Sequence, residues 1–169
     1  RFIRVRTGLY RLRYFPTSLN EHVMIAWLPL KDAGAVVSHA SALHLHDLSD
    51  VIPSDVHLTL PRAQRGQRRR PGVQLHTTSH FPECTSVRTV DGMAVTSVER
   101  SIVDALAEGV SWEQIGLAVE QATERGVTTP ARIVDAARFE SERVRRLVAD
   151  LVASDRRVSS KRPPPPRTV

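Results

Sequence analysis

The sequence predicts an α+β protein: a small mixed β-sheet packed with a C-terminal group of helices and preceded by a β-hairpin. As far as Thr96, apolar and polar residues alternate in short runs, which is typical of half-buried strands. After Thr96 the apolar residues recur at helical spacing. The chain has 169 residues and an apolar share of 41%, which is compatible with one sizeable core.

The chain opens on a predicted β-hairpin. Ile3 and Val5 alternate with arginines, and Gly8 suits a tight turn before a second strand. Two interpretations of the basic side chains stay open: contacts to DNA phosphates, or the solvated face of an edge hairpin. The arginines concerned are Arg4, Arg6, Arg11 and Arg13.

A helix is predicted next. Ser18 and Glu21 fit a capping box, Trp27 is expected in the core, and Pro29 should end the helix. The segment from Ala35 to Arg62 then predicts a compact unit. In this unit a serine caps a short helix, a breaker region follows, and an alternating strand ends at Pro61.

The loop over residues 62–72 carries the densest positive charge of the chain, with five arginines within nine positions: Arg62, Arg65, Arg68, Arg69 and Arg70. Guanidinium groups match phosphate oxygens, so the loop is a candidate contact for phosphate or for an acidic toxin surface. A solvated loop is the alternative. No aromatic residue interleaves the arginines, which argues against a stacking surface for single-stranded nucleic acid.

Three more strands complete the expected sheet of about four strands. Residues 73–76 should pair with residues 56–60. Residues 86–90 and 93–96 should form a hairpin around Asp91-Gly92, a favoured two-residue turn.

Helices fill the remainder of the chain. Capping boxes are predicted at Thr96 with Glu99 and at Ser111, and Thr129-Pro130 should open a third helix. Trp112 is expected on the apolar face of the second helix.

A last helix carries an apolar stripe over residues 144–152, which must be covered by the domain or by a partner. The proline- and arginine-rich tail over residues 156–169 is expected to be disordered.

Charge and cysteine content restrict the partners. The net charge is +6, and residues 1–95 hold 12 basic against 7 acidic residues. This balance suits a polyanion partner. Cys84 is the single cysteine, which fits a reducing cytoplasm, and no apolar run reaches the length of a membrane span.

No pattern in the sequence supports catalysis. His39, His44 and His46 lie close together in the sequence, but their spacing matches no helical i, i+4 ligand pair. G-x-S-x-G, the P-loop and the dinucleotide-binding glycine pattern do not occur. We therefore expect no enzyme, no cofactor and no metal site.

Three segments together resemble the AbiEi antitoxins of bacterial abortive-infection toxin–antitoxin systems. Residues 8–12 resemble the end of the family's winged helix-turn-helix, and residues 37–62 and 92–104 resemble its two other signatures, so that the resemblance extends over residues 1–137. The positions that match the motif, and for which a structural role is expected, are Ser38, His39, Ser41, Leu43, His46, Pro53, Thr96, Glu99, Arg100 and Asp104.

The resemblance implies three regions: residues 1–15 as the wing hairpin that ends a winged helix domain, residues 16–155 as the antitoxin domain, and residues 156–169 as the tail. It also implies two activities. The winged helix represses the protein's own operon by binding operator DNA, and the second domain neutralises a nucleotidyltransferase toxin, often without a stable complex. The recognition helix that would precede the hairpin is not in this sequence.

Two alternatives stay open. The first is a stand-alone DNA-binding transcriptional regulator with no toxin partner. The second is a non-catalytic accessory protein or degenerate endonuclease, against which the missing acidic–lysine motif argues.

Overall fold

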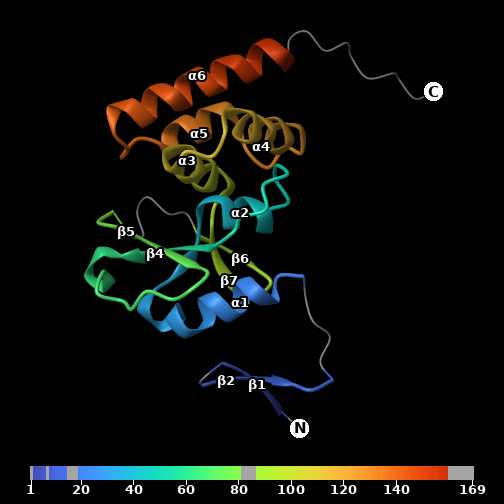
Figure 1. Cartoon of the computed structure of the whole chain (residues 1–169). Helices are drawn as coiled ribbons and strands as arrows, with labels where there is room; N and C mark the ends of the chain where they lie inside the picture. Colours follow the sequence, from blue (N-terminus) through green and yellow to red (C-terminus); the bar gives the residue numbers. More distant parts are fainter. Residues whose placement is uncertain (1, 7, 15–18, 81–86, 160–169) are drawn as a thin grey trace, which may run out of the picture.

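The computed structural model describes residues 2–6, 8–14, 19–80 and 87–159, with backbone only for Arg6 and residues 155–159. A five-stranded sheet separates α1 on one face from α2 and the C-terminal helices on the other, and a separate two-stranded hairpin lies beyond α1 (Figure 1). This arrangement confirms the predicted α+β class, the mixed sheet, the C-terminal helices and the preceding hairpin.

The elements follow one another in this order: β1 (Phe2–Arg6), β2 (Leu9–Leu12), α1 (Glu21–Trp27), a 3-10 helix η1 (Leu28–Ala33), β3 (Val36–Val37), α2 (His39–Leu45), β4 (Val56–Pro61), a 3-10 turn η2 (Arg62–Gln64), β5 (Val73–Thr78), β6 (Val87–Val90), β7 (Met93–Thr96), α3 (Val98–Glu108), α4 (Trp112–Glu124), α5 (Pro130–Ala136) and α6 (Glu142–Ser159).

The sheet has the strand order β5-β4-β3-β7-β6. β4 pairs in parallel with β5 and β3 in parallel with β7, whereas the β3–β4 and β6–β7 pairs are antiparallel. The prediction of about four strands omitted β3, which stands at the centre of the sheet. A strand of two residues is too short to show any alternation in the sequence.

Both predicted hairpins form. β1 pairs with β2, and the turn contains Gly8 at φ 78°. Between β6 and β7, Asp91 and Gly92 both have positive φ, at 49° and 78°. Positive φ at both central residues is what a tight type I′ turn requires.

Two apolar clusters make the core. One lies between the sheet and the helices α1 and α2, and includes Trp27, whose indole N–H donates to the Ala35 carbonyl at 2.7 Å. The other joins α3, α4, α5 and α6, with Leu106 and Ile115 among its members. Trp27 therefore lies in the core as expected.

The helix termini depart from the predicted caps in several places. Ser97, not Thr96, caps α3 by accepting from the Arg100 N–H. α1 begins after Asn20 without a side-chain cap, and Ser18 lies outside the described residues. α1 ends at Trp27, two residues before Pro29, as expected, and Pro29 lies near the start of the 3-10 helix η1, which continues to Ala33.

The remaining helix predictions divide. Ser111 and Thr129 cap α4 and α5 as expected. Trp112, expected on the apolar face, is 39% exposed because it is the first residue of α4 and lies at the edge of that face.

The apolar stripe of α6 packs on the other helices, with Val148, Leu151 and Val152 buried. The helix runs through Ser159 and so takes in the first residues assigned to the tail. Residues 160–169 and Cys84 lie outside the described part of the chain. Among the described helices, none has the length and apolar character needed to cross a membrane.

Candidate functional site

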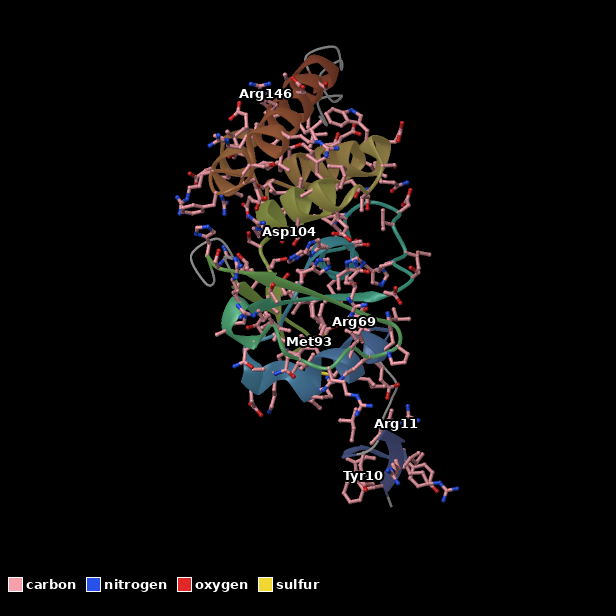
Figure 2. The ribbon with its side chains drawn as sticks, turned by 60° about the vertical axis from the view of Figure 1, so that its left-hand side comes forward. Tyr10, Arg11, Arg69, Met93, Asp104 and Arg146 are labelled. Carbon is pink, nitrogen blue, oxygen red and sulfur yellow. The ribbon has the colours of Figure 1, made fainter. Side chains whose placement is uncertain are left out.

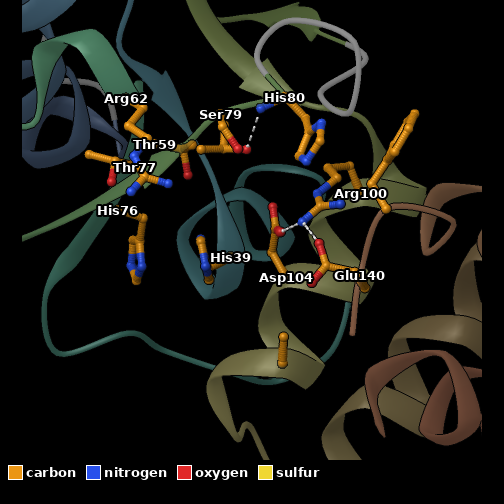
Figure 3. A pocket seen from close by; sticks show the side chains of 13 residues that line it. His39, Thr59, Arg62, His76, Thr77, Ser79, His80, Arg100, Asp104 and Glu140 are labelled. Carbon is orange, nitrogen blue, oxygen red and sulfur yellow. Dashed lines mark hydrogen bonds and ion pairs between the residues drawn. The ribbon is translucent and has the colours of Figure 1, made fainter. Parts of the chain in front are cut away.

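A polar pocket of about 330 Å³ lies between the sheet, the start of α2 and one side of α3 (Figure 3). Its walls come from β4, β5, α2, α3 and the segment after α5. Ionisable side chains dominate the lining: His39, Arg62, His76, His80, Arg100, Asp104 and Glu140.

The parallel pairing of β4 with β5 places several polar side chains on one face of the sheet. His57 lies opposite Gln74, and Thr59 lies opposite His76. Because side chains alternate along a strand, all four project to the same side. His39, the first residue of α2, meets them there.

His39, His57 and His76 gather into what we call the histidine cluster. Nδ1 of His57 lies 3.1 Å from Nε2 of His76. The rings of His39 and His76 are stacked, with centroids 3.8 Å apart. One ring nitrogen from each of the three lies within 4.8 Å of the others.

Burial sets the charge of the cluster. It lowers the pKa of His39 to about 2, and the neighbouring His76, His57 and Arg100 act in the same direction. Burial also lowers the pKa of His57 and of His76, although Glu108 acts to raise both. The three imidazoles are therefore neutral at pH 7.

Hydroxyl groups hold His39 in place. The Thr59 hydroxyl donates to Ser38 Oγ at 2.7 Å, and Ser38 Oγ lies 2.8 Å from His39 Nδ1. Ser38 precedes α2 as predicted, but it makes no side-chain cap bond, because its oxygen is engaged with these two neighbours.

On the other wall, Arg100 is held between two carboxylates (Figure 3). Its Nη2 pairs with Asp104 and, at 2.6 Å, with Glu140. Burial opposes the charge on Arg100, but the two carboxylates outweigh it and raise its pKa. Burial raises the pKa of Asp104 to about 6 against the opposing effect of Arg100, so that Asp104 is mostly ionised at pH 7.

The other motif residues tie the elements around the pocket together. His46 Nε2 lies 2.7 Å from the Thr96 carbonyl, which joins the end of α2 to β7. Ser41 Oγ accepts from the His57 N–H at 3.0 Å. Glu99 accepts from Thr128 Oγ1 and pairs with Arg132, each at 2.8 Å.

Two motif residues, Leu43 and Pro53, lie away from the pocket lining, one in the apolar core and one in a loop. Leu43 of α2 is fully buried and belongs to the apolar cluster of the C-terminal helices. Pro53 is half-buried in the connection from α2 to β4. The motif residues thus serve the core and the pocket wall together.

The arginines of the predicted cluster have different surroundings. Arg62 lines the pocket beside the histidines. Arg69 lines a separate hollow along β5 (Figure 2), Arg65 and Arg68 are exposed, and Arg70 is half-buried. Arg62 is the first residue of the 3-10 turn η2, and the other four arginines follow that turn.

The hairpin arginines also divide. Arg11 pairs with Glu21 of α1 at 2.9 Å. Arg4 and Arg11 stand at adjacent paired positions, opposite Tyr10 and Ile3, and therefore project to opposite faces of the hairpin. Arg13 is exposed, and the side chain of Arg6 lies outside the described atoms.

His39 lies near His44 and His46 in the sequence, but the fold does not bring these two into the cluster. The partners of His39 are His57 and His76, which no motif in the sequence links to it. His57 and His76 were available as the polar positions of two alternating strands that were expected to pair. Setting those strands in register would have placed the two side chains together.

No family model matches this chain, and none of the curated proteins does. The crystal structure of the RV2827C protein from Mycobacterium tuberculosis is similar, with a TM-score of 0.56 and 13% sequence identity. The match covers 86% of this chain and 57% of that one, so this chain spans little more than half the length of that protein. At this identity the likeness shows the fold alone.

Proposed function

We propose that the chain is an AbiEi-type antitoxin, which neutralises a cognate nucleotidyltransferase toxin and, through a winged helix domain, represses its own operon. The proposal rests first on the resemblance of three ordered sequence segments. It concerns a binding protein, and no catalytic step is part of it.

One structural observation supports the proposal most. Motif residues from two segments far apart in the sequence meet around one pocket: His39 from α2, and Arg100 and Asp104 from α3. All three are buried. Three of the motif residues therefore contribute to one part of the fold, which supports a shared role for them.

The surface that we assign to toxin binding is a basic edge of the molecule. Arg65, Arg68 and Arg69 are exposed on the connection between η2 and β5, away from the apolar core. A nucleotidyltransferase carries acidic metal-binding residues and binds nucleotide phosphates and RNA. The basic edge suits either that acidic site or competition for the polyanion.

The hairpin is the part of the chain that we assign to DNA. Its exposed arginines predict weak binding without sequence preference, and strong dependence on salt because counterions are released from the phosphates. Adding a recognition helix before the hairpin should confer tight binding to the operator. If the chain as given already separates operator from random DNA at physiological salt, this assignment is wrong.

Co-expression tests the antitoxin function. The proposal predicts a nucleotidyltransferase gene next to this one. Its product should arrest growth when expressed alone, and this chain should restore growth. A toxin with its metal-binding carboxylates replaced provides the control for expression burden. Continued arrest with folded chain present would refute neutralisation, and operator binding by the extended protein would then favour a stand-alone regulator.

A further inference from the structure

We propose that the histidine cluster of His39, His57 and His76 binds one divalent transition metal ion, with zinc favoured by these ligands. Imidazole nitrogen suits zinc, copper, nickel and iron, whereas magnesium and calcium select oxygen ligands. The proposal is independent of the antitoxin function, because it depends only on the geometry of the cluster.

The spacing of the nitrogens fits one ion. Zinc binds histidine nitrogen at about 2.0–2.1 Å with tetrahedral angles, which places two ligand nitrogens roughly 3.3 Å apart. Nδ1 of His57 and Nε2 of His76 are 3.1 Å apart. One nitrogen of each ring lies within 4.8 Å of the other two. The stacked rings of His39 and His76 turn about their side-chain bonds when the lone pairs converge on one ion.

In two of the three histidines, His76 and His39, the opposite ring nitrogen faces an oxygen, as ligating histidines need. Metal-bound histidines almost always use their second nitrogen to donate to a carboxylate or another oxygen. His76 Nδ1 faces Glu108 Oε2 at 3.8 Å, and Gln74 fixes that carboxylate by donating to it at 2.9 Å. His39 Nδ1 meets Ser38 Oγ at 2.8 Å, which leaves Nε2 for the ion.

The surrounding structure constrains the backbone of the three ligand residues. His57 and His76 are fixed by the register of two paired strands. His39 stands at φ 54°, a left-handed conformation uncommon for residues other than glycine. Such a conformation persists where the surroundings impose it, and it frequently accompanies a functional site.

Three protein ligands leave a fourth position of a tetrahedral ion open, as in catalytic zinc sites. His39 and His76 also line the pocket, so the ion would lie at its end and take a water or a small anion from it. The positive charge nearby does not exclude a cation, because Arg100 is paired with Asp104 and Glu140.

Metal titration of the full chain tests the proposal. After treatment with a chelator, the protein is titrated with Co²⁺, followed by its visible absorption, and then with Zn²⁺, which should displace it. We expect one ion per chain and loss of that binding in His57→Ala and His76→Ala. His22→Ala and His44→Ala are the matched controls and should bind like wild type, because these histidines lie outside the cluster.

A milder variant decides the matter should the alanine variants fail to fold. Glu108 is 36% exposed, so Glu108→Gln should leave the fold intact and weaken zinc binding by about 10- to 100-fold. The proposal is overturned if the wild-type chain takes up no stoichiometric ion, which would leave a hydrogen-bonded, stacked histidine cluster. It is also overturned if the control variants lose as much binding as the cluster variants, or if Glu108→Gln binds as tightly as wild type.

Discussion

The two sides of α3 have opposite chemistry. One side sends Ile102, Val103 and Leu106 into the apolar cluster shared with α4, α5 and α6. The other side presents Arg100 and Asp104 to the pocket. Both sides are buried, so the contrast lies in the chemistry and not in exposure.

This contrast separates stability from binding. Apolar burial stabilises a fold at about 25 cal/mol per Å² of buried surface. A buried ion pair contributes little net stability, because desolvation offsets its attraction. We therefore expect the apolar side to hold the domain together, and we infer that the charged side is retained for what the pocket binds.

Breaking the ion pair should have the largest effect on stability. Asp104→Ala leaves the buried Arg100 with Glu140 alone, and we expect a loss of about 3–5 kcal/mol in chemical denaturation. The double variant Arg100→Met with Asp104→Leu should recover most of it, because both buried charges are then gone and Glu140, which loses its partner, is 24% exposed and can be hydrated. A double variant as unstable as the single one would show that the pair itself stabilises the fold.

Truncating a side chain on the apolar side of α3 should have the next largest effect on stability. Leu106 is 7% exposed within the helical cluster, and Leu106→Ala should cost about 2–5 kcal/mol. Denaturant titration measures the loss. A change below about 0.5 kcal/mol, the range of ordinary surface substitutions, would mean that this side of α3 faces a partner instead of a core.

The buried His39 of the pocket should also make the free energy of unfolding depend on pH. His39 keeps a pKa of about 2 when folded, while the unfolded chain binds a proton near the ordinary value of 6.5. Its contribution to stability is therefore complete above pH 6.5 and is lost as the pH falls below it. One such group changes the free energy of unfolding by at most about 1.4 kcal/mol per pH unit.

Asp104 acts in the opposite direction, since its raised pKa favours the folded state as the pH falls from about 6. Comparing wild type with His39→Gln in the presence of a chelator removes this common contribution. As the pH falls from 6 to 5, the unfolding free energy of wild type should decrease relative to that of the variant, because only wild type has the buried neutral His39. Equal slopes would contradict the burial of a neutral His39.

Local patterns in the sequence predict the apolar side well and the pocket poorly. The stripe through Leu106 follows from helical periodicity, which depends only on neighbours in the chain. The histidine cluster depends on the parallel register of β4 with β5 and on the place of α2, none of which a local pattern contains. β3 was not predicted for the same reason, since its two residues form a strand only through pairing with β4 and β7.

The smallest effect on stability is expected at the basic edge. Replacing Arg65, Arg68 and Arg69 by serine removes exposed charges, so the melting temperature should match that of wild type. A matched control removes the same charge from α6 through the exposed Arg143, Arg145 and Arg146 (Figure 2 shows Arg146). Arg70 is left in place because it is half-buried.

Growth rescue with these two variants tests the central claim, which is that the basic edge, and not the charged surface of α6, opposes the toxin. In cells that express the nucleotidyltransferase, the α6 variant should restore growth like wild type. The variant of the basic edge should fail to do so, although it melts at the same temperature and accumulates to the same level. Full rescue by the basic-edge variant, or equal failure of both, would contradict the account.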